Sequence, residues 1–199
     1  DRRIKILIAE GILFKTNVNV GVNYKIEELK SFDAIVLCGG ASKRRSLPTL
    51  GVDANGVVQA MDFLTQQTKV VFGEKIKGQI LATDKNVIVI GGGDTGSDCI
   101  GTSNRQGAKS VINFEIMPKP PGYRSPTTPW PYWPLQLKTS SSHKEGCDRN
   151  WLINTKEFVK DNEGKLIALK TINVKWEMLV GERPKLIEIE GTEKTWPCD

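Results

Sequence analysis

The spacing of apolar residues divides the first two thirds of the chain into helical and strand-like segments. Apolar residues three or four positions apart predict helices, and a glycine follows two of them where a helix should end. The expected helices are Arg2–Glu10, Ile26–Leu29, Val57–Phe72, Asp94–Arg105 and Leu135–Ser142. Short, mainly apolar runs between turn residues instead predict strands. The expected strands in this part are Ile12–Val20, Asp33–Cys38, Lys85–Ile90 and Lys109–Ile116.

From Asn150 onward, apolar and polar residues alternate, which is typical of half-buried strands. The expected strands are Trp151–Phe158, Leu166–Met178 and Lys185–Glu190. Turn residues separate them, so they predict an antiparallel meander. Residues 73–84 have the composition of a linker, and we therefore expect two domains, 1–80 and 81–199.

A strand, a glycine-rich turn, a helix and a second strand follow one another between Lys85 and Ile116. A βαβ unit has about this length, roughly 30 residues, and its two strands run parallel. Together with the meander, this order predicts an α/β protein with a Rossmann-like dinucleotide-binding domain. That domain would hold a βαβ unit in a parallel sheet, followed by antiparallel strands.

The turn of this unit contains the pattern Gly91-x-Gly93-x-x-Gly96, directly after a strand and at the start of a helix. In that context Gly91 permits the tight turn, Gly93 lets the backbone approach a pyrophosphate, and Gly96 lets the helix pack closely on the strand. The helix N-terminus would present free N–H groups to the phosphates. The candidate cofactor-binding residues are Gly91, Gly92, Gly93, Asp94, Thr95 and Gly96. The alternative is a glycine-rich turn without a ligand.

Signals for the choice between NADH and NADPH conflict. Glu115 lies near the end of the second strand, where a carboxylate binds the adenosine ribose hydroxyls of NAD. Lys119 and Arg124 follow in the next loop and could instead hold the 2′-phosphate of NADPH. Each of the three could equally be a solvated surface charge, so the sequence leaves the preference open.

Composition narrows the function further. The chain has 199 residues and a formal net charge of +5, and its basic residues are spread along it, which does not favour a nucleic-acid partner. It lacks the run of about 18 apolar residues that a membrane helix needs. Its four cysteines are far apart and form no Cys-x-x-Cys, so we expect no metal site and a reducing cytoplasm. His143 has no nucleophile at a recognisable spacing, and we assign no catalytic residue.

Beyond the glycine pattern, longer motifs resemble the small (beta) subunit of glutamate synthase. They cover essentially the whole chain, and in combination they are specific. The matching segments are Ser31–Ala41, Gln59–Leu64, the strand–turn–helix Val87–Ser103, Asn113–Pro121, the Pro-Trp-Pro-Tyr-Trp-Pro run at 129–134 and His143–Gly146.

The resemblance implies two nested dinucleotide-binding domains, one for FAD and an inserted one for NADPH or NADH. Hydride passes from NAD(P)H to FAD, and the electrons then pass through iron–sulfur clusters to a large (alpha) subunit that makes glutamate from 2-oxoglutarate and glutamine. It places Gly39, Gly40 and Ala41 at a second FAD contact and Val20 near the FAD adenine. The family's first FAD fingerprint, its last FAD segment and its iron–sulfur region are missing.

We therefore expect a fragment of a longer protein, with a partial FAD domain, that is inactive by itself. Two alternative functions stay open: part of a related flavin and iron–sulfur oxidoreductase, and a dinucleotide-binding module without catalysis.

Overall fold

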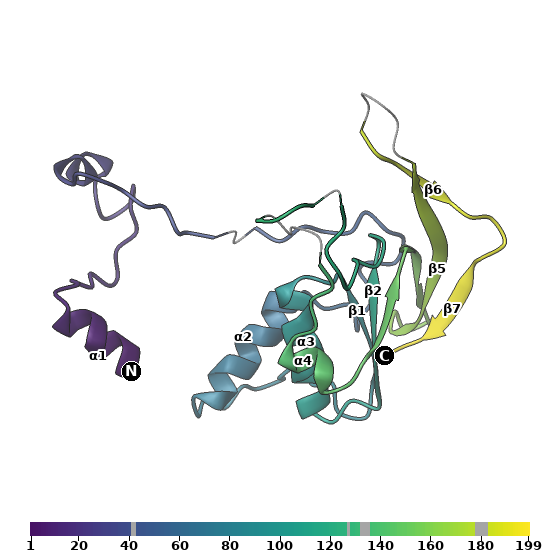
Figure 1. The fold of residues 1–199 in the computed structure, drawn as a ribbon. Coiled ribbons are helices and arrows are strands. Elements are labelled where there is room, and N and C mark those ends of the chain that lie inside the picture. Colours follow the sequence, from purple (N-terminus) through teal and green to yellow (C-terminus); the bar gives the residue numbers. More distant parts are fainter. Residues whose placement is uncertain (41–42, 127, 132–135, 178–182) are drawn as a thin grey trace. The chain divides into compact units, whose positions relative to one another are not determined.

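A computed structural model describes residues 1–40, 43–126, 128–131, 136–177 and 183–199. The chain forms two compact units, Asp1–Arg44 and Arg45–Asp199 (Figure 1). The predicted boundary near residue 80 falls inside the second of these units. The assignment of 1–80 to an FAD domain stays a prediction.

The first unit contains an α-helix, α1 (Arg2–Ala9), and a 3-10 helix, η1 (Ile26–Ser31), both close to their predicted positions. The strands expected at 12–20 and 33–38 are wrong, because neither segment pairs with another strand. A strand is held by a neighbouring backbone, and among the described residues of this unit only an isolated bridge joins Val20 to Tyr24. Accordingly, Val36 and Leu37 are 82% and 88% exposed.

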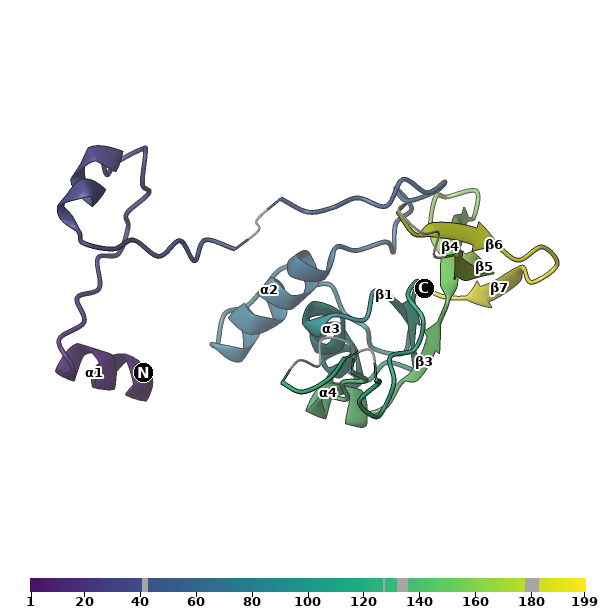
Figure 2. The same cartoon turned by 45° about the horizontal axis from the view of Figure 1, so that its top comes forward.

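The second unit begins with the βαβ unit that the sequence predicts. Strand β1 (Asn86–Ile90), helix α3 (Asp94–Arg105) and strand β2 (Ser110–Glu115) follow in that order, and β1 pairs with β2 in parallel. A further strand, β3 (Asp148–Trp151), pairs with the other edge of β2, also in parallel. Helix α3 packs on β1 and β2, and α2 (Ala60–Val71) packs against α3 (Figures 1 and 2).

Helix α4 occupies Ser141–Lys144, whereas the sequence placed a helix at 135–142. The expected start, Leu135, lies outside the described residues. The Ser140 hydroxyl accepts a hydrogen bond from the backbone N–H of His143 at 3.2 Å. This cap starts the helix at Ser141 rather than earlier.

The antiparallel sheet is built around one long strand, β5 (Leu166–Glu177). It pairs with β4 (Ile153–Lys160), β6 (Lys185–Glu188) and β7 (Lys194–Pro197). The sequence missed β7. It also missed most of β3 and began the following strand at Trp151, whereas β4 begins at Ile153, because Leu152 has a φ of 59° that ends the extended backbone there.

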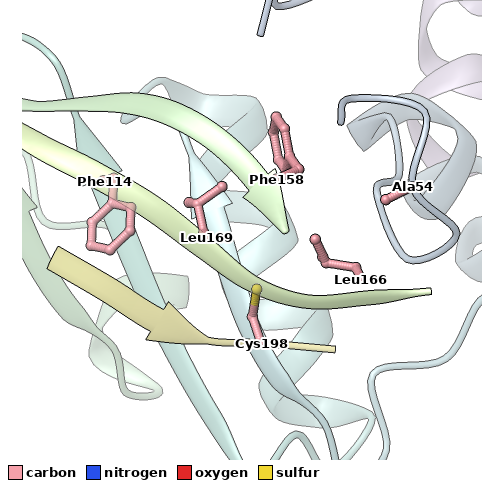
Figure 3. Close-up of a cluster of buried hydrophobic side chains, with 6 residues drawn as sticks. All are labelled: Ala54, Phe114, Phe158, Leu166, Leu169 and Cys198. Carbon is pink, nitrogen blue, oxygen red and sulfur yellow. The ribbon is translucent and has the colours of Figure 1, made fainter. Parts of the chain in front are cut away.

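Two groups of buried apolar side chains hold the second unit together. One lies beneath the antiparallel sheet and includes Phe114 of β2, Leu169 of β5 and Cys198 (Figure 3). The other joins Phe63 of α2 to the βαβ unit through Val89, Cys99, Ile100 and Val111. Asp199 is bonded to the start of β1: the Asp199 N–H donates to the Asn86 carbonyl at 3.1 Å, and the Asn86 N–H donates to Asp199 Oδ2 at 2.9 Å.

Candidate dinucleotide-binding site

The glycines of the turn between β1 and α3 meet different local demands. Gly91 has a φ of +112°, a conformation that side chains disfavour, and its N–H donates to the Phe114 carbonyl at 2.8 Å. A Cβ atom at Gly96 would collide with the Gly91 carbonyl oxygen, so this glycine permits the close packing of α3 on β1. A Cβ atom at Gly93 would meet open space. Gly93 therefore has no packing reason to be glycine in the protein itself.

The carboxyl group of Glu115 lies against Gly92. A Cβ atom at Gly92 would overlap the carboxyl group of Glu115, which folds back from the end of β2 onto the turn. Sequence reasoning included Gly92 in the site without a separate role. The structure supplies that role, since Gly92 makes room for the strand-end carboxylate.

The first turn of α3 is open to an anion. Gly93 is the residue before the helix, and no side chain caps it. The first intrahelical bond runs from the Ser97 N–H to the Gly93 carbonyl at 3.0 Å, so the N–H groups of Asp94, Thr95 and Gly96 precede it. Such groups, together with the helix dipole, favour phosphate binding.

Asn113 of β2 holds the turn from below, a role that the sequence reasoning missed. Its side chain is fully buried, and Nδ2 donates to the carbonyls of Val89 and Gly91, both at 3.0 Å. Asn113 therefore ties the end of β1 to β2. A single amide among the apolar residues 111–114 was the available signal for this role.

Glu115 is joined at the edge of the turn by a residue that is distant in sequence. Arg149 of β3 donates from Nη2 to Glu115 Oε1 at 3.1 Å, and the two side chains are only 13% and 15% exposed. Arg149 also donates from Nη1 to the Lys138 carbonyl at 3.0 Å and lies 5.0 Å from the centre of the Trp151 ring. The sequence reasoning missed Arg149, because the pairing of β2 with β3 could not be foreseen.

The two cations proposed for a 2′-phosphate lie in different surroundings. The Lys119 ammonium is 5.0 Å from the Trp151 ring, and so belongs to the cluster around Arg149. Arg124 is exposed, and its Nη1 donates to the nearby Thr128 carbonyl at 3.4 Å. Of the two, the structure brings Lys119 close to the Glu115–Arg149 pair.

A cavity of about 1010 Å³ opens on the same turn. Gly91, Gly93, Thr95 and Gly96 line it, together with apolar side chains such as Phe63 and Val89. Glu115 and Lys119 are not among its lining residues. A cavity of this size can hold a ligand as large as part of a dinucleotide.

The residues proposed for FAD lie in the first unit. Val20, Gly39 and Gly40 are exposed there, and Ala41 lies outside the described residues. Their role toward FAD stays a prediction.

The cysteines and the histidine show no pattern of an activated nucleophile. Burial raises the pKa of both the Cys99 and the Cys198 thiols to about 11, so both stay protonated at neutral pH. The pKa of His143 is lowered, first by burial and then by the nearby Arg149 charge. Its Nδ1 lies 2.9 Å from the Ser140 hydroxyl, which in turn lies 2.5 Å from Ser97 Oγ.

Within the described residues, no group of three or more His, Cys, Asp or Glu side chains could hold a metal ion. The helices described in the structure are all too short or too polar to span a bilayer.

A solved structure shares the fold of this chain. The structure of Mycobacterium tuberculosis FprA in complex with NADPH aligns with 91% of this chain and 52% of its own, at a TM-score of 0.58 and 14% identity. This likeness concerns the fold, and it confirms the predicted α/β class with a parallel and an antiparallel sheet. No family model matches the sequence.

The sequence itself matches glutamate synthases. It is 45% identical to the glutamate synthase [NADPH] small chain of Mycobacterium tuberculosis over 97% of this chain. It is 44% identical to the glutamate synthase [NADPH] small chain of Bacillus subtilis over 100% of this chain. The glutamate synthase [NADH] of Saccharomyces cerevisiae is 39% identical, again over the full chain. The chain spans about 40% of the two small chains and 10% of the yeast protein. The resemblance to the glutamate synthase small chain is therefore confirmed.

Proposed function

We propose that this chain is the NAD(P)H-binding, electron-input part of a glutamate synthase small chain. The turn Gly91–Gly96 carries the proposal, because it combines a φ that requires glycine, an open approach at Gly93 and an uncapped helix N-terminus. The similarity to glutamate synthase small chains supports it independently.

In this function the chain binds and orients the dinucleotide, and bound NAD(P)H supplies a hydride for FAD. The N–H groups of Asp94, Thr95 and Gly96 would bind the pyrophosphate, and Glu115 or Lys119 would contact the adenosine ribose end. No acid–base residue of this chain is needed, because the cofactors carry the chemistry. The alternatives of a related flavin oxidoreductase and of a binding module without catalysis share this site.

The electrons would pass from FAD through iron–sulfur clusters, held outside these 199 residues, to a large (alpha) subunit that forms glutamate from 2-oxoglutarate and glutamine. The names of the bacterial relatives, each a small chain, support such a partner. The four cysteines are all free thiols, which supports a location in the reducing cytoplasm.

The test is calorimetric titration of the chain with NADH, NADPH and FAD in separate runs. We expect at least one nicotinamide cofactor to bind. Gly93→Ala should weaken that binding about tenfold or more, because its methyl group would occupy the approach of the pyrophosphate. Gly122→Ala is the matched control, since its Cβ also meets open space, outside the turn. Equal affinity in the Gly93 variant and the control would contradict the proposal.

A further inference from the structure

We infer that the Glu115–Arg149 pair sets the nicotinamide-dinucleotide selectivity of this chain, and that in its paired form it favours a ribose 2′-hydroxyl over a 2′-phosphate. This inference rests on the proposed function and names the residues that choose between NADH and NADPH. The relatives do not decide the matter, since they include proteins named for each cofactor.

Glu115 is held where it would meet the adenosine ribose. Its carboxyl group folds onto Gly92, in the middle of the glycine turn, and the absence of a side chain at Gly92 is what permits this position. A carboxylate placed there accepts hydrogen bonds from the two ribose hydroxyls and repels a phosphate on the 2′-oxygen. Position and charge therefore both favour NADH.

Arg149 is the group that could reverse this preference. Its guanidinium is the nearest cation to the carboxylate, and the ion pair with Glu115 occupies Nη2 while the Lys138 carbonyl occupies Nη1. A guanidinium is well suited to a 2′-phosphate, but in the pair its charge is neutralised by Glu115. Arg149 thus orients the carboxylate and is itself kept from acting as a phosphate ligand.

Glu115, Arg149, Trp151 and Lys119 form a charged cluster, and two of its hydrogen-bond donors have no acceptor among the described residues. Arg149 Nε and Trp151 Nε1 are buried and have no hydrogen-bond partner among the residues that the structure describes. Buried donors are normally satisfied, so these two are available to a ligand, and Arg149 Nε becomes a phosphate donor only when Glu115 no longer neutralises the guanidinium. Lys119, above the Trp151 ring, adds a second positive charge that an unpaired Arg149 could use together with its own.

The experiment compares dissociation constants for NADH and NADPH in the wild-type chain, Glu115→Gln, Arg149→Gln and the double variant. The wild type should bind NADH more tightly. Glu115→Gln removes the repulsion and releases Arg149, so it should weaken NADH and tighten NADPH, shifting their ratio about tenfold or more. In the double variant the gain for NADPH should disappear, because the released guanidinium is absent.

The outcomes separate this inference from the proposed function. If the wild type binds neither nicotinamide cofactor, both fail. The wild type could bind a nicotinamide cofactor while Glu115→Gln changes the affinities for NADH and NADPH in the same proportion. The Glu115–Arg149 pair would then be only structural, and this inference alone would fail. Thermal melting checks the folding of each variant.

A second measurement needs no substitution. Titration of the wild type with 5′-AMP and with adenosine 2′,5′-bisphosphate (2′,5′-ADP) tests the ribose end directly, because the two probes differ only by the 2′-phosphate. We expect 5′-AMP to bind more tightly, and tighter binding of 2′,5′-ADP would overturn the inference.

Discussion

Gly93 and Gly96 are only three residues apart, but the protein backbone requires one glycine and a bound ligand requires the other. Gly96 is constrained by the protein, because a side chain there would strike the backbone of Gly91. Gly93 faces open space, so only a ligand can require it to be glycine. Their substitution by alanine should therefore affect different measurements.

Gly96→Ala should lower the free energy of unfolding by about 1–3 kcal/mol, the usual cost of forcing extra volume into a packed contact. Urea unfolding of this variant, with Gly93→Ala as its control, checks the expectation. The Gly93 variant should unfold at nearly the wild-type urea concentration. Equal stability of the Gly96 variant and the wild type would show that α3 can move away from β1 without cost.

The sequence predicts the roles of some single residues of the site and not of others. The positions of Gly91 and Gly96 could be assigned, because a local strand–turn–helix pattern dictates their backbone. Arg149 could not be assigned, because its role depends on the pairing of β3 with β2 across 34 residues of sequence. Neighbouring residues in the sequence determine the backbone conformation of a turn, whereas they do not determine which strands pair in a sheet.

Among the elements, the short helix α4 connects the helical layer to the charged cluster. Its capping residue Ser140 bonds both Ser97 of α3 and His143, and His143 is influenced by Arg149 and Glu115. The neutral form of His143 is favoured in the folded protein, because its pKa there is below the ordinary value of 6.5. As the pH falls, His143 therefore takes up a proton in the unfolded chain at a higher pH than in the folded protein.

This difference predicts that stability falls as the pH drops below about 6.5, until the folded histidine is protonated as well. Urea unfolding between pH 7 and pH 5 measures the slope. In His143→Gln, which cannot take up this proton, the decline should be shallower than in the wild type. The same slope in both proteins would mean that His143 contributes nothing to the acid sensitivity.

Element boundaries reflect the same division between local and distant causes. Helix α3 was predicted with its observed bounds, because a glycine turn precedes it and Gly107 follows. The strands expected at 12–20 and 33–38 failed, since an apolar run becomes a strand only beside another one. Strand β7 was missed because Lys194–Pro197 shows little alternation, and its pairing with β5 makes it a strand.

For the whole molecule, the division at residue 44 makes a prediction about cleavage. Lys43, Arg44 and Arg45 are exposed and lie where the two units join along the chain. Brief digestion with trypsin should cut there first and leave a fragment of residues 46–199, identifiable by mass spectrometry. Earlier cutting within 73–84 would instead favour the boundary near residue 80.

Two recombinant fragments sharpen this test. Residues 45–199 should keep the thermal stability and the dinucleotide affinity of the second unit. Residues 81–199 lack α2, whose Phe63 packs with Val89 and Ile100, and whose Gln66 accepts a bond from the Ile80 N–H at 2.9 Å. Losing this aromatic contact should cost more than about 3 kcal/mol. Equal stability of both fragments would contradict it.

The hydrogen bonds between Asn86 and Asp199 have a topological consequence. They bring together two points 113 residues apart, so that the chain enters its first parallel strand and finishes its last antiparallel one at the same place. A segment with adjacent entry and exit can be transplanted into a loop of a host protein without stretching either.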